Sequence, residues 1–353
     1  MHPQTMRSRR SEMATGTVAR PVEDVGRKRS FGNVGVPLKV TGLIAVIVGL
    51  VFLAITMTNN LFEVGPAFEE MIDDFRPVLT DESLDTARAD LATLEAAGEE
   101  FRTTVGPAMA EALGMTPDEF GAMVQTQYPA VAQGMAALPA VTETFNGLID
   151  TLDSQGDLFA SADAIPTDGL PASTVPWIIA ISGVLAIIVG VMLFKPGRAW
   201  PMLALALGLI LVVSTVVLGL PQKAADADEL NENLTPIYTQ ELIDGANASL
   251  AVVGAMGEEM QTEMLPDLAV QLGMTPEELN AFMGENFPAT AAAMQSMPES
   301  LPRFGAFVGI FGANLDNYMT IQPVAFTPII WTFLLGGALI VLSSGYCVLT
   351  KQS

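Results

Sequence analysis

Four long apolar stretches stand out along the chain, at residues 37–57, 177–194, 200–220 and 327–349. Each is close to the ~20 residues that a helix needs to cross a ~30 Å hydrocarbon core. None contains an acidic residue, and Lys39 is the single basic residue, near enough to an end for its ammonium to reach the interface. Buried helices of soluble proteins are shorter and carry a polar stripe, so the pattern predicts four membrane-spanning helices.

Between these stretches the pattern changes to that of amphipathic helices, with apolar residues at alternating steps of three and four. The first series is Leu84, Ala87, Leu91, Leu94, Gly98, Phe101, Val105 and Ala108, and the second is Ile243, Ala246, Leu250, Val253, Gly257, Met260 and Met264. Pro107 and Pro266 are expected to kink or end these helices. Thr116 and Thr275, each followed by proline and a capping-box glutamate, predict the start of a second helix. No strand signal appears, so each segment is predicted to be a bundle of three or four helices.

The two polar segments are copies of each other at a constant offset of 159, without a gap over residues 71–145. Gly114–Phe120 (GMTPDEF) recurs as Gly273–Leu279 (GMTPEEL), and Glu99-Glu100 recurs as Glu258-Glu259. Each copy includes two spans, so both copies have the same orientation. The sequence therefore predicts an all-α integral membrane protein with an internal parallel repeat, in which two tandem extracytoplasmic bundles lie side by side about a pseudo-two-fold axis along the membrane normal.

The copies differ in length just before the second span of each pair. Residues 160–173 form a linker rich in proline, aspartate and serine in the first copy. Its counterpart is about seven residues shorter, since Pro176 aligns with Pro328 at an offset of 152. The shared residues are mostly those of helix packing, so a specific activity is expected where the copies differ or meet.

Charge assigns the segments to two sides of a membrane. Residues 58–175 carry 21 acidic and three basic residues, and residues 221–326 carry 15 acidic and two basic residues, within a formal net charge of −23. The other basic residues lie in the N-terminal tail, at Lys39, in the turn 195–198 and at Lys351. The positive-inside rule then predicts that both termini are cytoplasmic and both acidic segments lie outside. The predicted order is a disordered basic tail (1–36), span (37–57), bundle (58–175), span (177–194), turn (195–199), span (200–220), bundle (221–326), span (327–349) and C-terminus (350–353).

Residues suited to metal or acid–base chemistry are few in the acidic segments. The single cysteine, Cys347, lies in the fourth span and the single histidine, His2, in the tail, which argues against zinc sites, histidine triads and disulfides outside the membrane. The paired glutamates Glu99-Glu100 and Glu258-Glu259 are the acid–base candidates, but no nucleophile accompanies them. We therefore predict no catalytic residue, no cofactor and no enzyme activity.

An acidic cluster next to the first span is the candidate for a divalent cation, because carboxylates are the ligands that Ca²⁺ prefers. It consists of Glu69, Glu70, Asp73 and Asp74. No loop with EF-hand spacing accompanies the cluster, and a solvated acidic surface is the favoured interpretation. The sequence therefore gives no assigned metal site.

Within the spans the polar residues are hydroxyls, which gives little support to an ion-coupled transporter. Small residues that allow close helix approach are Gly42, Gly49, Ser182, Ala186, Gly190, Gly336, Gly337 and Gly345. Packing within the chain is favoured over packing against a partner. Of the 19 methionines, many lie on the apolar faces of the predicted amphipathic helices, here called the seams. Core filling is favoured over binding of apolar partners or Cu(I). The seam methionines are Met109, Met123, Met135, Met256, Met260, Met264, Met294 and Met297.

Two functional hypotheses follow from this pattern. The first is a non-enzymatic multi-pass protein of a bacterial plasma membrane whose paired acidic bundles bind a partner protein or envelope component, as a scaffold or accessory subunit. The alternative is a protein that binds a lipid or small molecule in a groove between the bundles or the spans. The expected partners are the lipid bilayer, a membrane or envelope protein and a second copy of the chain; nucleic acid is not expected.

Overall fold

The computed structural model describes residues 36–350 apart from 168, 196 and 198. The described residues are helical almost throughout and contain no β-strand, only an isolated bridge between Thr167 and Leu170. The all-α prediction is confirmed for this part of the chain. The predicted basic tail, except Val36, and the last three residues lie outside the described residues.

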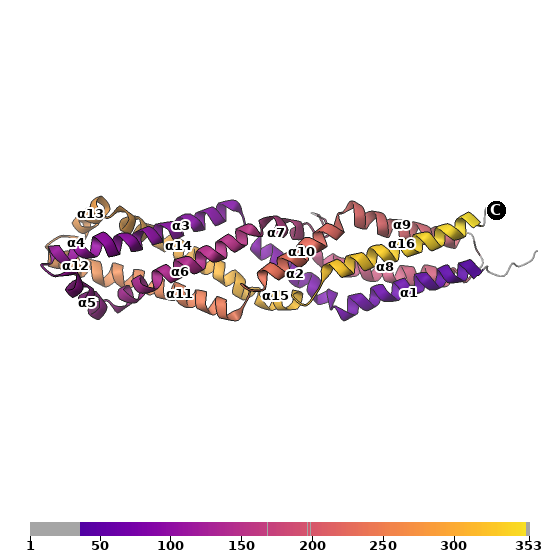
Figure 1. Cartoon of the computed structure of the whole chain (residues 1–353), viewed down its shortest axis with the longest axis horizontal. Helices are drawn as coiled ribbons and strands as arrows, with labels where there is room; N and C mark the ends of the chain where they lie inside the picture. The colour runs from indigo at the N-terminus through magenta and orange to yellow at the C-terminus, as the bar shows by residue number, and fades with distance from the viewer. Residues whose placement is uncertain (1–35, 168, 196, 198, 351–353) are drawn as a thin grey trace, which may run out of the picture.

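Four helices are long and apolar enough to cross a membrane. They are α1 (Val36–Thr58), α8 (Val175–Met192), α9 (Ala199–Val217) and α16 (Phe326–Thr350). They coincide with the four predicted spans and lie together at one end of an elongated molecule (Figure 1). Helix α1 packs on α8, α9 packs on α16, and α1 also contacts α16. Length and composition are thus those of a multi-pass membrane protein.

Glycines allow these helices to approach closely, as the small residues predict. A Cβ atom at Gly42 would lie 2.7 Å from the carbonyl oxygen of Gly190, and one at Gly190 would lie 2.8 Å from that of Gly42. On the other pair, a Cβ at Gly208 would lie 2.9 Å from the carbonyl oxygen of Gly337. Packing within the chain is therefore confirmed at these positions. Gly345 differs, since the space beside it is open.

Outside the spans, the first half contains seven helical elements and a short turn. They are α2 (Leu61–Phe75), α3 (Asp81–Glu100), the π-helical turn η1 (Phe101–Val105), α4 (Gly106–Ala112), α5 (Pro117–Gln127), α6 (Pro129–Ser154), α7 (Gly156–Asp163) and the 3-10 turn η2 (Ala172–Thr174). The second half contains α10 (Leu220–Leu234), α11 (Gln240–Glu259), η3 (Met260–Met264), α12 (Leu265–Leu272), α13 (Pro276–Asn286), α14 (Pro288–Ala313) and α15 (Leu315–Ile321). Each element from α10 to α15 begins at the residue that corresponds, under the offset found in the sequence, to the first residue of its counterpart.

Both predicted capping boxes are present. The backbone nitrogen of Thr116 donates to the Glu119 carboxylate at 2.8 Å, and that of Thr275 donates to Glu278 at 2.9 Å. Pro107 and Pro266 were expected to kink or end the long helix, but the helical path continues through both. In each half a π-helical turn precedes the proline, and the wider turn allows the helix to continue although proline offers no N–H.

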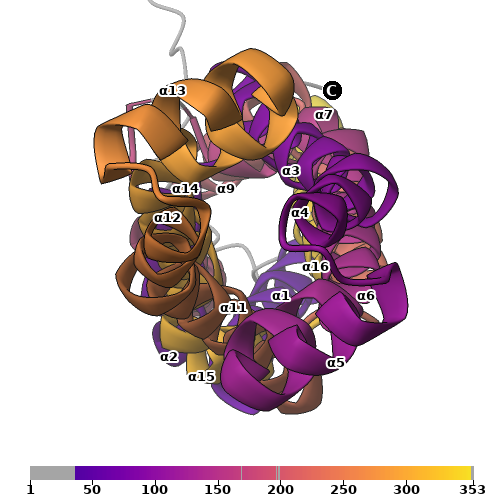
Figure 2. The same ribbon diagram turned by 90° about the vertical axis from the view of Figure 1, so that its left-hand side faces the viewer.

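The long helices of both halves form one shared bundle. Helix α6 packs on α11 and α14 packs on α3, and both pairs join opposite halves, while α3 with α6 and α11 with α14 join helices of the same half. Figure 2 views this bundle along its axis from the end where α5 and α13 lie. The expectation of two separate bundles is corrected, because each apolar seam is covered partly by the other half. An edge-to-face contact of Phe145 with Phe304, with centroids 5.3 Å apart, lies at this shared core.

The predicted seams do form the core. Leu91 and Val253 are among the most deeply buried residues, and five of the seam methionines are also buried: Met109, Met256, Met260, Met264 and Met297. The other three seam methionines pack partly buried against the same core. The interpretation of methionine as a core filler is therefore confirmed.

A junction layer of shorter helices connects the bundle to the spans. Helix α2 packs on α15 and α10 packs on α7, again across the halves (Figure 1). The chain turns from α1 into α2 at Asn60, with φ 48°, and from α9 into α10 at Gly219, with φ 64°. These left-handed residues end the span and redirect the chain, so that α2 and α10 start a new layer instead of extending the spans.

Candidate functional site

The glutamates considered for acid–base chemistry are the last residues of α3 and α11, and one of each pair lies beside the start of another helix. On α3, the Glu100 carboxylate accepts hydrogen bonds from the backbone nitrogens of Ala289 (3.4 Å) and Thr290 (2.7 Å) and from Thr290 Oγ1 (2.7 Å). On α11, Glu259 accepts one from the backbone nitrogen of Val131 at 2.7 Å. Each carboxylate therefore caps the first turn of a helix from the opposite half, where the helix dipole favours negative charge.

The neighbouring glutamates have a different environment. Glu99 and Glu258 are exposed, and Glu99 pairs with Arg102 one turn away. The two members of each sequence pair therefore do not converge on a common site. Their arrangement is that of one cap and one solvated residue in each half.

The carboxylates of the acidic cluster next to the first span contact different groups of the same chain. Glu69 accepts a hydrogen bond from the backbone nitrogen of Ser173 at 3.2 Å, Asp73 pairs with Arg76 at 2.8 Å, and Asp74 accepts from Asn314 Nδ2 at 2.8 Å. Glu70 lies on the exposed face of α2. Within the described part of the chain, no group of three or more histidine, cysteine or acidic side chains is placed to hold a metal ion.

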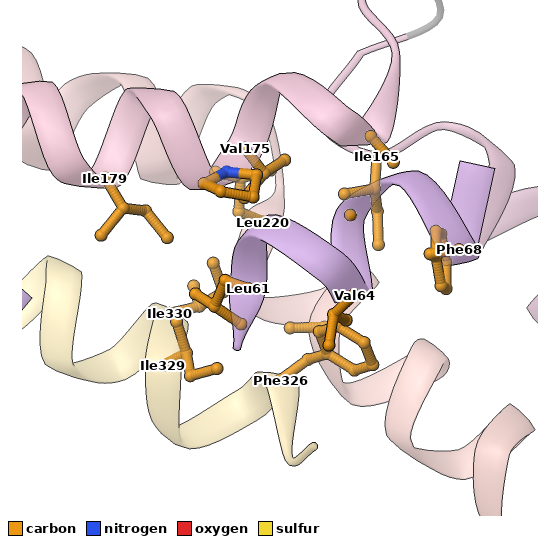
Figure 3. Close-up of a pocket in the computed structure, with 14 residues that line it drawn as sticks. Leu61, Val64, Phe68, Ile165, Val175, Ile179, Leu220, Phe326, Ile329 and Ile330 are labelled. Carbon is orange, nitrogen blue, oxygen red and sulfur yellow. The ribbon is translucent and has the colours of Figure 1, made fainter. Parts of the chain in front are cut away.

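An apolar cavity lies where the spans meet the junction layer (Figure 3). It measures about 610 Å³, its open mouth included. The first turns of α2, α8, α10 and α16 surround it, so both halves contribute. In Figure 3, Ile179 of α8 lies on one side and Ile329 and Ile330 of α16 lie on the opposite side. The lining is Leu61, Val64, Gly65, Phe68, Ile165, Ala172, Val175, Pro176, Ile179, Leu220, Ala224, Phe326, Ile329 and Ile330.

A second cavity, of about 620 Å³ with its open mouth, adjoins the first and is polar. Phe68, Ile165 and Ala172 line both cavities, so the two spaces share a wall or passage. The rest of the second lining comes from α2 and from the linker of the first half: Glu69, Ile72, Asp73, Arg76, Ala162, Asp163, Thr167, Gly169, Leu170 and Pro171. The combination is amphipathic, with apolar walls at the level of the spans and charged walls beyond them.

Arg76 is the cationic group of the polar cavity. Its Nη2 donates to Asp163 Oδ1 at 2.6 Å and its Nε donates to Asp163 Oδ2 at 3.2 Å, while Nη1 lies 2.8 Å from Asp73 Oδ1. The hydrogen bonds that Arg76 donates to Asp163, with a further contribution from Asp73, raise the pKa of Arg76 above its ordinary value. The guanidinium is therefore a fixed positive charge paired with two carboxylates, those of Asp73 and Asp163, and Glu69 lines the same cavity.

The second half places other residues at the corresponding positions. Under the offset of the repeat, Thr235 corresponds to Arg76 and Asn231 corresponds to Ile72. Asn231 Nδ2 donates to the carbonyl oxygen of Gln322 at 3.0 Å, which ties the shorter linker onto α10. The backbone nitrogen of Phe326 donates to Asp228 at 2.7 Å. Asp228 is the counterpart of Glu69, so the helix-capping role recurs while the guanidinium does not.

Two residues of the polar cavity, Glu69 and Asp73, were named from the sequence, but as candidates for a cation and not for this arrangement. The extra length of the linker marks the segment that forms the polar cavity, as the copies differ there. Arg76 and Asp163 were missed because they are 87 positions apart in the sequence, and single charges in an acidic segment give no motif.

No protein-family model matches the chain, and a search of curated proteins gives no significant match.

Proposed function

We propose that this protein is a non-enzymatic multi-pass membrane protein that binds an amphiphilic lipid at the junction between its spans and its bundle. The observation that carries the proposal is the pair of adjoining cavities, one lined entirely by apolar residues and one whose lining includes four charged side chains. Ligand pockets are typically apolar with a few placed polar groups. In this proposal part of an acyl chain packs against the lining of the apolar cavity, and the headgroup lies in the polar cavity at the level of the interface.

The location of the polar cavity supports the same proposal. One side of it is formed by α2 and the other by residues of the 160–173 segment, in which the first copy is longer than the second. Helix packing alone does not account for the extra length of this segment, because the second copy packs without it. We infer that the chain arose by duplication of a unit with two spans, and that the first copy acquired the headgroup side of the site.

We further propose that the protein resides in the plasma membrane of a bacterium, with both termini cytoplasmic and the bundle outside. The distribution of basic and acidic residues supports this orientation. A cysteine introduced at Ser154 is expected to react with an impermeant reagent in intact cells, and one at Gly197 only after permeabilisation. The opposite pattern contradicts the orientation.

A second candidate function is that of a scaffold or accessory subunit that binds a partner protein or envelope component. The length of the bundle favours it, since the 26 residues of α6 extend about 39 Å at 1.5 Å per residue. At the end far from the spans, Val270 is 79% exposed. Cross-linking in intact membranes that captures one specific protein through this end supports the scaffold function, and this outcome is independent of lipid binding.

Lipid binding is tested by purification in mild detergent, followed by native mass spectrometry and lipid analysis. The Ala172→Trp variant places an indole where the two cavities adjoin and is expected to lose the bound lipid. Ile178→Trp is the matched control, because Ile178 is 42% exposed on α8 and lines neither cavity. Equal lipid content in both variants and in the wild type contradicts the proposal, as does a wild type with no lipid above the detergent background.

A further inference from the structure

We propose that the ligand's headgroup carries an ammonium group beside a phosphate, as in a zwitterionic aminophospholipid, and that anionic phospholipids are disfavoured. This inference rests on the proposed lipid-binding function and specifies the ligand of that site. It is carried by the charges that line the polar cavity.

The cavity wall is net negative. Among the described residues of its lining, three carry carboxylates, Glu69, Asp73 and Asp163, and one carries a guanidinium, Arg76. A headgroup with a net negative charge adds repulsion to this excess, and a headgroup with an ammonium relieves it. Charge complementarity therefore favours an amine-bearing ligand.

The guanidinium provides the complementary contact for a phosphate. Arginine carries five N–H donors, and Arg76 makes three close contacts, two with Asp163 and one with Asp73. N–H groups of the Arg76 guanidinium therefore remain to donate to a phosphate oxygen. The planar arrangement of these donors matches the geometry of a phosphate. An ammonium near the carboxylates and a phosphate near Arg76 together describe a phosphoethanolamine-type headgroup.

The apolar cavity fixes the source of this headgroup. A free phosphoamine has no apolar surface to bury against the walls formed by Leu61, Val64 and Ile179. An acyl chain has such a surface, and its burial there lowers the free energy of binding. The same cavity lies at the first turns of α8 and α16, the level at which the headgroup region of a bilayer meets the hydrocarbon. The ligand is therefore a membrane lipid and not a soluble metabolite.

The experiment uses the full-length chain in detergent with an equimolar mixture of phosphatidylethanolamine and phosphatidylglycerol of identical acyl chains, measured by native mass spectrometry. We expect the wild type to bind phosphatidylethanolamine at least about fivefold more often than phosphatidylglycerol. In the double variant Asp73→Asn with Asp163→Asn, the preference is expected to disappear or reverse, because Arg76 then lacks its carboxylate partners. The matched control is Asp150→Asn with Asp153→Asn, which removes two carboxylates that contact Arg88 on the bundle surface, at positions that line neither cavity; it is expected to keep the preference.

The wild-type measurement is decisive even where a variant fails to fold. Phosphatidylglycerol bound as often as phosphatidylethanolamine, with or without Mg²⁺ present, overturns the headgroup assignment and leaves the lipid-binding function standing, provided Ala172→Trp abolishes binding. Binding of neither lipid above background overturns both. A preference that the Asp150 and Asp153 control loses as fully as the Asp73 and Asp163 variant overturns the assignment of these carboxylates.

Discussion

The carboxylate of Glu100 on α3 accepts two hydrogen bonds of 2.7 Å from Thr290, one from its backbone nitrogen and one from its Oγ1, at the first turn of α14. The residues belong to opposite halves of the chain. The corresponding residue of the other half, Glu259, makes the corresponding contact with Val131 at 2.7 Å. Two equivalent caps thus hold the halves together at the far part of the bundle.

Replacing Glu100 by alanine is expected to destabilise the bundle by about 1–2 kcal/mol, because the N–H groups at the start of α14 lose their cap. Glu259→Ala is expected to cost less, since Glu259 accepts from one backbone nitrogen and no hydroxyl. Thermal unfolding in detergent, followed by circular dichroism, measures the effect. Glu99→Ala and Glu258→Ala are the controls at exposed neighbouring positions. Controls that destabilise as much as Glu100→Ala contradict the assignment of the cap.

Helices α1 and α8 approach each other closely at Gly42 and Gly190. Gly190→Ala is expected to destabilise the protein by about 1–3 kcal/mol, because the new Cβ lies 2.8 Å from the carbonyl oxygen of Gly42 and the helices have to move apart. Gly345→Ala on α16 is the control, since that position has open space. The melting temperature in detergent distinguishes the two variants. Equal melting temperatures contradict the close approach.

Local patterns predicted much of this fold because they depend on neighbouring residues. The apolar stretches gave the spans, and Thr116 with Glu119 gave the start of a helix, since a capping box forms within four residues. The heptad seam identified buried positions such as Leu91. It did not identify the covering helix, because a seam specifies which face is buried and not which helix packs on it. That is why the pairing of α3 with α14 of the other half was not predicted.

The site was less predictable for a related reason. Its apolar cavity exists because Asn60 and Gly219 turn the chain out of the line of the spans, and an asparagine at one of these positions gives no strong signal of a left-handed residue. The polar cavity requires Arg76 to meet Asp163 across the linker. The extra length of residues 160–173 was visible in the sequence, because a difference in length between two copies can be seen without any structure.

The ion pair between Arg303 and Asp90 provides a test of the contact between the halves. It joins α14 to α3, and the Asp90 side chain is 15% exposed. Arg303→Ala is expected to destabilise the protein by about 1–2 kcal/mol, since it leaves a largely buried carboxylate without its partner. Arg102→Ala is the control, because Arg102 pairs with Glu99 on the exposed surface of the same helical stretch, where ion pairs contribute about 0–1 kcal/mol. Chemical unfolding curves that coincide for the two variants contradict a shared bundle.

Tyr128 makes the stability of the shared bundle dependent on alkaline pH. Its hydroxyl donates to Asp267 Oδ2 of the other half at 3.0 Å, and burial together with this carboxylate raises the pKa of Tyr128 to about 12. The ordinary tyrosine pKa is about 10. The folded state therefore holds the proton more tightly than the unfolded state. The contribution to stability is fully present below about pH 10 and is lost as the pH rises through about 12.

The Tyr128→Phe variant separates this effect from packing. The chain already carries a buried phenylalanine, Phe287, at the corresponding position of the second half, so the ring is expected to fit without the hydroxyl. The variant is expected to lose about 0.5–1.5 kcal/mol near pH 8, with the hydrogen bond, and to show a shallower fall in stability between pH 9 and pH 11.5 than the wild type. Urea unfolding at a series of pH values measures both. Parallel curves for the variant and the wild type over this interval contradict the prediction, because they mean that Tyr128 ionises alike in the folded and unfolded states.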